Sequence, residues 1–231
     1  MSVKQHVPNA ITSLNLICGV IGIWFTLARG DCTTALYFML AAVVFDFCDG
    51  LTARLLGAYS EIGKELDSLA DVVSFGVLPA AMMLITYNKL GGNPAWLGWS
   101  ALLIAVFSAL RLAKFNTDER QHESFIGLPT PACALICASL CCVLRSCAWI
   151  IPAASVALSY LLVCELPMFS FKLGKDIDAD LNTRMKRYAI ISISVIWAVV
   201  VPVAGLPWQT IITGVLLIYI LENALCAVFK V

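Results

Sequence analysis

Long apolar segments alternate with short polar ones along almost the whole chain. Eight of these segments approach about 20 residues, the length at which an α-helix crosses the hydrocarbon core of a bilayer. The predicted spans cover residues 8–29, 33–55, 66–88, 95–115, 130–148, 150–169, 186–204 and 208–229. Pro152 and Pro167 interrupt the sixth of them. The pattern predicts an all-α, polytopic integral membrane protein with about eight transmembrane helices.

The composition agrees with a membrane protein. Of the 231 residues, 61% are apolar and 13% are charged, which argues against a soluble α/β enzyme. The net charge is zero, so it gives no indication of a nucleic-acid partner. Most of the ten cysteines lie inside apolar segments, where a thiol packs as a small hydrophobe. No linker or change of composition divides the chain, so residues 1–231 are predicted to form a single domain.

Lysine and arginine are divided unevenly between the two ends of the predicted spans. Of the 15 Lys and Arg residues, only Arg29, Lys89 and Arg145 fall at one set of ends, and the others fall at the ends that both termini share. Because basic loops tend to stay in the cytoplasm, this asymmetry predicts that both termini are cytoplasmic. The connection between the second and third spans then also faces the cytoplasm.

Four aspartates stand near the cytoplasmic ends of the second and third spans. Asp46 and Asp49 are three residues apart in one predicted helix, and Asp67 and Asp71 are four apart in the next. Residues at these spacings share a helix face, so each helix presents a pair of carboxylates. A short turn predicted over residues 59–64 makes the two helices antiparallel neighbours. An ionisable side chain in a span costs roughly 2.5–3.5 kcal/mol, so four together indicate a functional site.

The chemistry of these carboxylates points to divalent metal ions. Four carboxylates at one depth repel one another unless cations neutralise them, and two hard divalent ions balance four negative charges. Paired ions of this kind clamp the attacking and leaving oxygens of a phosphoryl centre. Gly50 and Ala53 leave room beside the aspartates, and Arg54 adds a cation suited to phosphate. Taken singly, the small residues are explained equally well as helix-packing positions.

The spacing of these residues resembles a family signature. It reads Asp46-x-x-Asp49-Gly50-x-x-Ala53-Arg54, then eight residues, then Gly63-x-x-x-Asp67-x-x-x-Asp71. This pattern resembles the complete signature of the CDP-alcohol phosphatidyltransferases. The resemblance implies a helical membrane enzyme, usually a homodimer, that transfers a phosphatidyl group from CDP-diacylglycerol to an alcohol and releases CMP. It also implies a six-helix catalytic core over about residues 1–170, followed by two further helices over about 186–229.

The resemblance further implies roles for individual residues. Asp46, Asp49, Asp67 and Asp71 would bind two divalent ions, Mg²⁺ or Mn²⁺, with Ca²⁺ as another ion that the site could hold. Asp71 would also be the base for the attacking hydroxyl. Besides Asp49, the residues expected to contact CDP-diacylglycerol are Asn9, Thr12, Asn15, Gly50, Ala53, Arg54 and Gly63. The first three belong to a segment that resembles the N-terminal element of the family.

Three later segments resemble the phosphatidylserine synthase branch of this family. They cover residues 74–80, 111–116 and 125–131, and they make L-serine the expected acceptor. The serine carboxylate needs a cation in the site, which Arg111 and Lys114 can supply. Both cations are also explained as ordinary anchors at the cytoplasmic surface. Asn116 is a further candidate contact.

Two other functions stay open on the sequence. Glycerol phosphate or inositol phosphate could be the acceptor, although such a dianion would favour an arginine cluster that is not evident. Intramembrane aspartates also form the ion path of cation- or proton-coupled transporters. Transporter sites usually lie near the bilayer midplane, whereas these carboxylates gather at one surface. We therefore expect a phosphatidyltransferase in a lipid bilayer. The compact size of the chain and the branch that it resembles make a bacterial cytoplasmic (inner) membrane the expected location.

Overall fold

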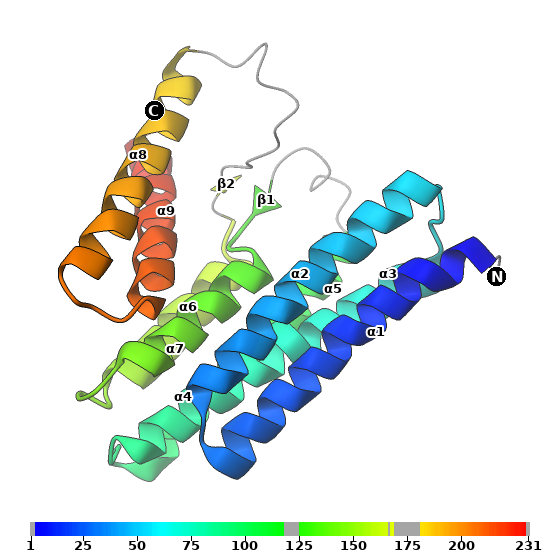
Figure 1. Ribbon diagram of the computed structural model, residues 1–231. Helices are drawn as coiled ribbons and strands as arrows, with labels where there is room; N and C mark the ends of the chain where they lie inside the picture. Colours follow the sequence, from blue (N-terminus) through cyan, green and yellow to red (C-terminus); the bar gives the residue numbers. More distant parts are fainter. Residues whose placement is uncertain (1–2, 118–124, 166, 169–180, 230–231) are drawn as a thin grey trace.

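The computed structural model describes residues 3–117, 125–165, 167–168 and 181–229, and most of them are helical (Figure 1). The α-helices are α1 (Val3–Trp24), α2 (Cys32–Leu56), α3 (Glu61–Asp71), α4 (Leu78–Lys89), α5 (Leu102–Thr117), α6 (Thr130–Val143), α7 (Ile150–Val163), α8 (Leu181–Val203) and α9 (Gln209–Phe229). The π-helical segments are η1 (Phe25–Arg29) and η2 (Val72–Val77), and η3 (Ala95–Ala101) is a 3-10 helix. Strands β1 (Phe125–Ile126) and β2 (Pro167–Met168) form a short antiparallel pair. The all-α prediction is confirmed, apart from this strand pair.

Four helices in the described part of the chain are long and apolar enough to cross a membrane. They cover His6–Arg29, Cys32–Leu56, Glu61–Lys89 and Ala95–Thr117, and they confirm the first four predicted spans. The third is one continuous helix made of α3, η2 and α4. Shorter apolar helical segments follow at Thr130–Val143, Ile150–Val163, Ser192–Val203 and Gln209–Asn223. The chain is therefore a polytopic integral membrane protein.

The fifth and sixth helices are shorter than the sequence predicted. α6 ends at Val143 and α7 at Val163, because Leu144 (ψ 122°) and Cys164 (ψ 150°) take extended backbone conformations. Pro167 lies in β2 and not in a helix. Proline lacks the N–H that a helix interior requires. The predictions of helix over residues 130–148 and 150–169 are therefore wrong at their C-terminal ends.

The connection between α2 and α3 is shorter than the predicted turn over 59–64. Gly57 terminates α2 in a left-handed conformation (φ 56°), which glycine adopts without strain. Ser60 caps α3, because its Oγ accepts a 3.0 Å hydrogen bond from the Gly63 N–H. Gly63 therefore lies in the first turn of α3, and only residues 57–60 connect the two helices.

The helices form a bundle in which successive long helices run in opposite directions (Figure 1). α1 packs along α2, α5 packs against α7, and α6 packs against α9. Buried apolar side chains form a continuous cluster through the bundle, including Leu36, Phe75, Met83 and Ile151. The start of α1 lies at the same end of the bundle as the connection between α2 and α3, and we call this the α2–α3 end.

Candidate active site

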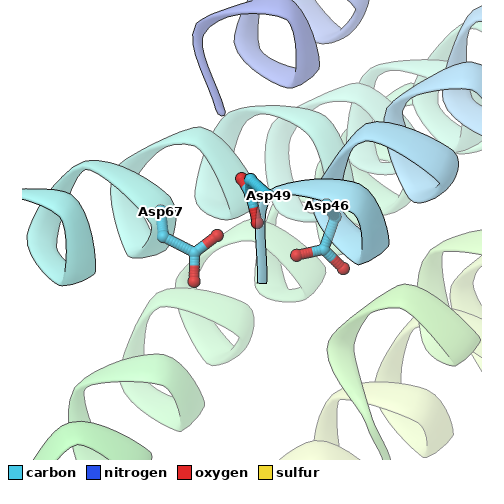
Figure 2. A group of neighbouring side chains, drawn as sticks. All are labelled: Asp46, Asp49 and Asp67. Carbon is cyan, nitrogen blue, oxygen red and sulfur yellow. The ribbon is translucent and has the colours of Figure 1, made fainter. Parts of the chain in front are cut away.

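Two carboxylate pairs meet near the α2–α3 end. Asp46 and Asp49 belong to α2, and Asp67 and Asp71 to α3. One oxygen each from Asp46, Asp49 and Asp67 lies within 4.8 Å of the other two, with Asp49 between its neighbours in Figure 2. Asp71 is one helical turn beyond Asp67, and electrostatic repulsion from the other three carboxylates acts on it. The structure therefore brings the four predicted aspartates together.

Helix α1 supplies a hydrogen-bond donor to one aspartate of each pair. The Thr12 hydroxyl donates a 2.5 Å hydrogen bond to Oδ2 of Asp49. The Asn15 side-chain amide donates a 3.1 Å hydrogen bond to Oδ1 of Asp71. Thr12 and Asn15 are three residues apart and so share a face of α1. Both are buried, which means that these bonds form away from bulk water and fix the two carboxylates.

The donor set fits a hard divalent cation. Oδ1 of Asp67 is buried and accepts no hydrogen bond from any residue that the structure describes. Asp49 is only 5% exposed, so its carboxylate is also largely withdrawn from water. A buried carboxylate without enough donors is stabilised by a cation, and Mg²⁺, Mn²⁺ and Ca²⁺ prefer oxygen ligands. Asp46, Asp49 and Asp67 are the residues best placed to hold an ion, with Asp71 beside them.

A cavity of about 220 Å³ opens next to the aspartates, between α1, α2 and the start of α3. Its lining includes seven of the eight residues predicted to contact CDP-diacylglycerol: Asn9, Thr12, Asp49, Gly50, Ala53, Arg54 and Gly63. The eighth, Asn15, is fully buried and contacts Asp71 instead. The structure thus gathers these positions from three helices around one space, although their individual contacts with a substrate remain predictions.

Further residues line this cavity that the sequence interpretation had not singled out. They are Pro8, Ala58, Tyr59, Ser60 and Lys64. Lys64 precedes Asp67 by three residues, so helical spacing alone would have placed it on the aspartate face. Together with Arg54 it gives the cavity two basic side chains. The other positions depend on how the connection between the helices folds.

Two glycines of the signature have different surroundings. A Cβ built on Gly50 would meet no atom within 4 Å, so this face of α2 is open toward the cavity. A Cβ built on Gly63 would approach Oδ1 of Asn9 and Oγ of Ser60 to 2.9 Å each. Gly63 therefore allows α3 to start close to α1, whereas Gly50 leaves space for a ligand.

The helix that carries Asp71 widens directly after it. Segment η2 is π-helical, and Pro79 follows in the first turn of α4. Proline has no N–H to donate to the preceding turn, which favours a local change in the hydrogen-bond ladder. Within η2, Ser74 donates a 3.0 Å hydrogen bond from its Oγ to the Asn15 carbonyl. The wide turn is thereby tied to the same α1 residue that holds Asp71.

The three residues predicted to bind serine differ in their burial and in their contacts. Arg111 is 7% exposed, and its Nη1 donates a 3.1 Å hydrogen bond to Oγ1 of Thr130. Its Nε is buried without a hydrogen-bond partner among the described residues, and it attracts Asp71 electrostatically. Lys114 is exposed. Asn116 donates a 2.8 Å hydrogen bond to Oγ of Ser68 and so links α5 to α3.

A model of one protein family matches most of the bundle. The family is described as CDP-alcohol phosphatidyltransferase, and the match covers residues 5–161, which include the four aspartates and the whole lining of the cavity. The chain belongs to the CDP-alcohol phosphatidyltransferase family. CDP-alcohol phosphatidyltransferases use divalent metals, in agreement with the acidic cluster, and membership removes the transporter alternative. α8 and α9 lie outside the matched residues.

Several curated relatives of this chain carry the name CDP-diacylglycerol–serine O-phosphatidyltransferase. The Bacillus subtilis relative is 34% identical over 172 residues, which are 73% of this chain and 92% of the relative. A Helicobacter pylori relative is 39% identical over 132 residues, 56% of this chain and 54% of the relative. The Methanocaldococcus jannaschii relative is 36% identical over 140 residues, 61% of this chain and 62% of the relative. The chain therefore spans nearly all of the first relative and roughly half to two thirds of the other two.

Proposed function

We propose that this protein transfers the phosphatidyl group of CDP-diacylglycerol to the hydroxyl of L-serine and releases CMP. The observation that carries the choice of serine is the buried guanidinium of Arg111, which lies near Asp71 with its Nε unpaired among the described residues. A guanidinium presents a planar fork of donors that matches a carboxylate. The name shared by the curated relatives supports the same acceptor.

The donor substrate is assigned to the cavity between α1, α2 and α3. Arg54 and Lys64 provide positive charge for the pyrophosphate, and Gly50 leaves room for it to approach α2. Asn9 and Tyr59 supply polar and aromatic surface for the nucleotide. The exposed apolar side chains of the helices face the hydrocarbon of the bilayer, where the acyl chains of the substrate would also stay. Only the headgroup then has to reach the aspartates.

The metal ligands are assigned to the carboxylate cluster. Asp46, Asp49 and Asp67 would hold one divalent ion, and Asp71 would share in holding a second. Mg²⁺ or Mn²⁺ is the proposed cofactor, and Ca²⁺ is an ion that the site would also bind. When bound, these ions would neutralise charge on the pyrophosphate and on the departing CMP. Thr12 would orient Asp49 as an outer-shell partner, in the way that hydrogen-bonded ligands usually are.

The chemistry is assigned to Asp71 and Arg111. Asp71 takes the proton of the serine hydroxyl as that oxygen forms a bond to the phosphorus attached to diacylglycerol. The bond between this phosphorus and the bridging oxygen of the pyrophosphate breaks, and the electron pair leaves with CMP. Arg111 holds the serine carboxylate, so the hydroxyl is presented to Asp71 instead of rotating freely. Asn15 keeps Asp71 oriented through its amide.

The membrane setting extends the proposal. In the sequence, twelve of the 15 lysines and arginines fall at the predicted span ends near the aspartates, so we assign that end of the spans to the cytoplasm. Soluble serine and CMP would then exchange with the cytoplasm. The proposed location is a bacterial cytoplasmic (inner) membrane, with the protein acting as a homodimer.

An acceptor comparison tests the proposed function. Purified protein in liposomes receives CDP-diacylglycerol, Mg²⁺ or Mn²⁺, and labelled serine, glycerol 3-phosphate or inositol phosphate. The expected result is CMP and labelled phospholipid in equal amounts with serine, and little product with the two phosphorylated acceptors. Product formation with a phosphorylated acceptor but not with serine would overturn the serine assignment and keep the phosphatidyltransferase assignment.

A further inference from the structure

The last helix of the chain reaches the interior of the bundle, although it lies outside the residues that the family model matches. α9 packs against α6 (Figure 1). The Thr213 hydroxyl donates a 2.7 Å hydrogen bond to Oγ of Ser139. Further along α9, Tyr219 and Ile220 are buried at 9% and 8% exposure and belong to the apolar cluster. One face of α9 is therefore part of the core.

The register of α9 against α6 places Tyr219 at the depth of the acceptor residues. α9 and α6 run in opposite directions (Figure 1), so moving six residues from Thr213 along α9 and six residues back from Ser139 along α6 leads toward the same end of the bundle. At 1.5 Å per residue both moves cover about 9 Å. They reach Tyr219 on α9 and Cys133 on α6, one turn from Thr130. Thr130 is the hydrogen-bond partner of Arg111.

The charge distribution around Arg111 agrees with this register. Cys133, Asp71 and Tyr219 are the groups that interact electrostatically with its guanidinium. Asp71 and Thr130 come from the matched part of the chain, whereas Tyr219 comes from α9. A phenol combines an apolar ring with one polar oxygen, so Tyr219 packs its ring in the core and keeps an oxygen that a cation attracts. The oxygen of Tyr219 is thus suited to face the guanidinium.

We propose that Tyr219 is a positioning residue of the acceptor site, whose phenol oxygen holds the Arg111 guanidinium in the orientation that receives the serine carboxylate. This inference rests on the proposed function. It assigns part of the acceptor specificity to α9, outside the segment that carries the common phosphatidyl-transfer chemistry. The effect of Tyr219 is therefore expected on serine and not on CDP-diacylglycerol, whose cavity lies between α1, α2 and α3.

The variant Tyr219→Phe separates this role from packing. Phenylalanine keeps the ring in the core and removes only the oxygen, so the variant should stay folded with its helices packed as in the unchanged protein. The KM for serine should rise on the order of 10-fold, the usual effect of losing a hydrogen bond to a charged group. The kcat and the KM for CDP-diacylglycerol should change less than about 2-fold. The control is Tyr160→Phe on α7, where the side chain is 66% exposed and its KM values should not move.

The outcomes distinguish the inference from the function on which it rests. If the unchanged protein makes phospholipid from serine and Tyr219→Phe leaves the KM for serine unchanged, the role of Tyr219 is refuted and the proposed function stands. Equal increases in the two KM values would also refute it, because they would indicate a general disturbance of the bundle. If the unchanged protein uses another acceptor instead of serine, the proposed function fails and the inference fails with it.

Discussion

The side-chain amide of Asn15 on α1 donates a hydrogen bond to Oδ1 of Asp71 on α3, across 3.1 Å and 56 positions of sequence. Asn15 is fully buried, and its backbone carbonyl accepts a second hydrogen bond from Ser74 in the π-helical segment η2. One residue of the first helix thus fixes both the aspartate proposed as the base and the wide turn that follows it. The geometry of the site therefore depends on α1 as much as on the helices that carry the aspartates.

Replacing Asn15 by alanine tests this dependence. The variant loses the hydrogen bond that orients Asp71, so kcat should fall by about 10- to 100-fold, as expected for a buried bond to a charged group. The measurement is CMP release at saturating serine and CDP-diacylglycerol. Ser13→Ala is the control, because Ser13 bonds only the Asn9 carbonyl within α1 among its described contacts. Equal activity of the two variants would show that Asn15 does not position the base.

Thr12 should matter through the metal ligand that it contacts. Thr12→Val keeps the shape of the side chain and removes the hydrogen bond to Asp49, so the Mg²⁺ concentration for half-maximal activity should rise by about 10- to 100-fold. Thr12→Ser retains a hydroxyl and should stay close to the unchanged protein. The metal titration is the readout. An unaltered Mg²⁺ requirement in Thr12→Val would show either that Asp49 is not a metal ligand or that Thr12 does not orient it.

Gly50 offers a test in which stability and activity should move in opposite directions. Alanine at this position meets no atom within 4 Å and is a better helix former, so Gly50→Ala should unfold at the same or a higher temperature. Its methyl group enters the cavity, so the KM for CDP-diacylglycerol should rise by about 10-fold.

The control for Gly50 is Gly57→Ala, at a position that does not line the cavity. Alanine there is strained by the left-handed backbone (φ 56°), so this variant should lose stability while its folded fraction keeps the same KM. An unchanged KM in Gly50→Ala would place the donor substrate elsewhere.

Arg111 should act on serine through the shape of its guanidinium. Arg111→Lys keeps the charge but loses the planar fork, so the KM for serine should rise about 10-fold or more while the KM for CDP-diacylglycerol stays within about 2-fold. Arg29→Lys, in η1 directly after α1, where the guanidinium lies over the Trp24 ring, is a matched control without an expected effect. A proportional rise of both KM values in Arg111→Lys would contradict a contact with the serine carboxylate.

Helical spacing accounts for much of the site that the sequence predicted. Asp46 and Asp49, and likewise Asp67 and Asp71, share helix faces because they are three or four residues apart, and the same rule applies to Lys64. The long apolar segments correctly predicted the first four spans, because length and hydropathy decide whether a helix crosses a bilayer. The fold and the aspartate site were thus accessible from local patterns.

Contacts between distant segments were not accessible from those patterns. The bonds from Thr12 to Asp49 and from Asn15 to Asp71 join positions 37 and 56 residues apart, and only the family resemblance had singled out the two α1 residues. No sequence pattern singled out Tyr219, because its electrostatic interaction with Arg111 depends on how α9 packs against α6. Rotation and register of packed helices arise from the shapes of many side chains together.

The most direct measurement is CMP release by Asp71→Asn in liposomes with CDP-diacylglycerol, Mg²⁺ and labelled serine. Asparagine has nearly the shape of aspartate but cannot take a proton, so CMP release and labelled phospholipid should both fall by about 10²- to 10⁴-fold, while the variant stays folded. Asp31→Asn, at the other end of α2, is the matched control and should keep its activity. Turnover of Asp71→Asn close to that of the control would contradict the account, because the buried aspartate held by Asn15 would not be the base.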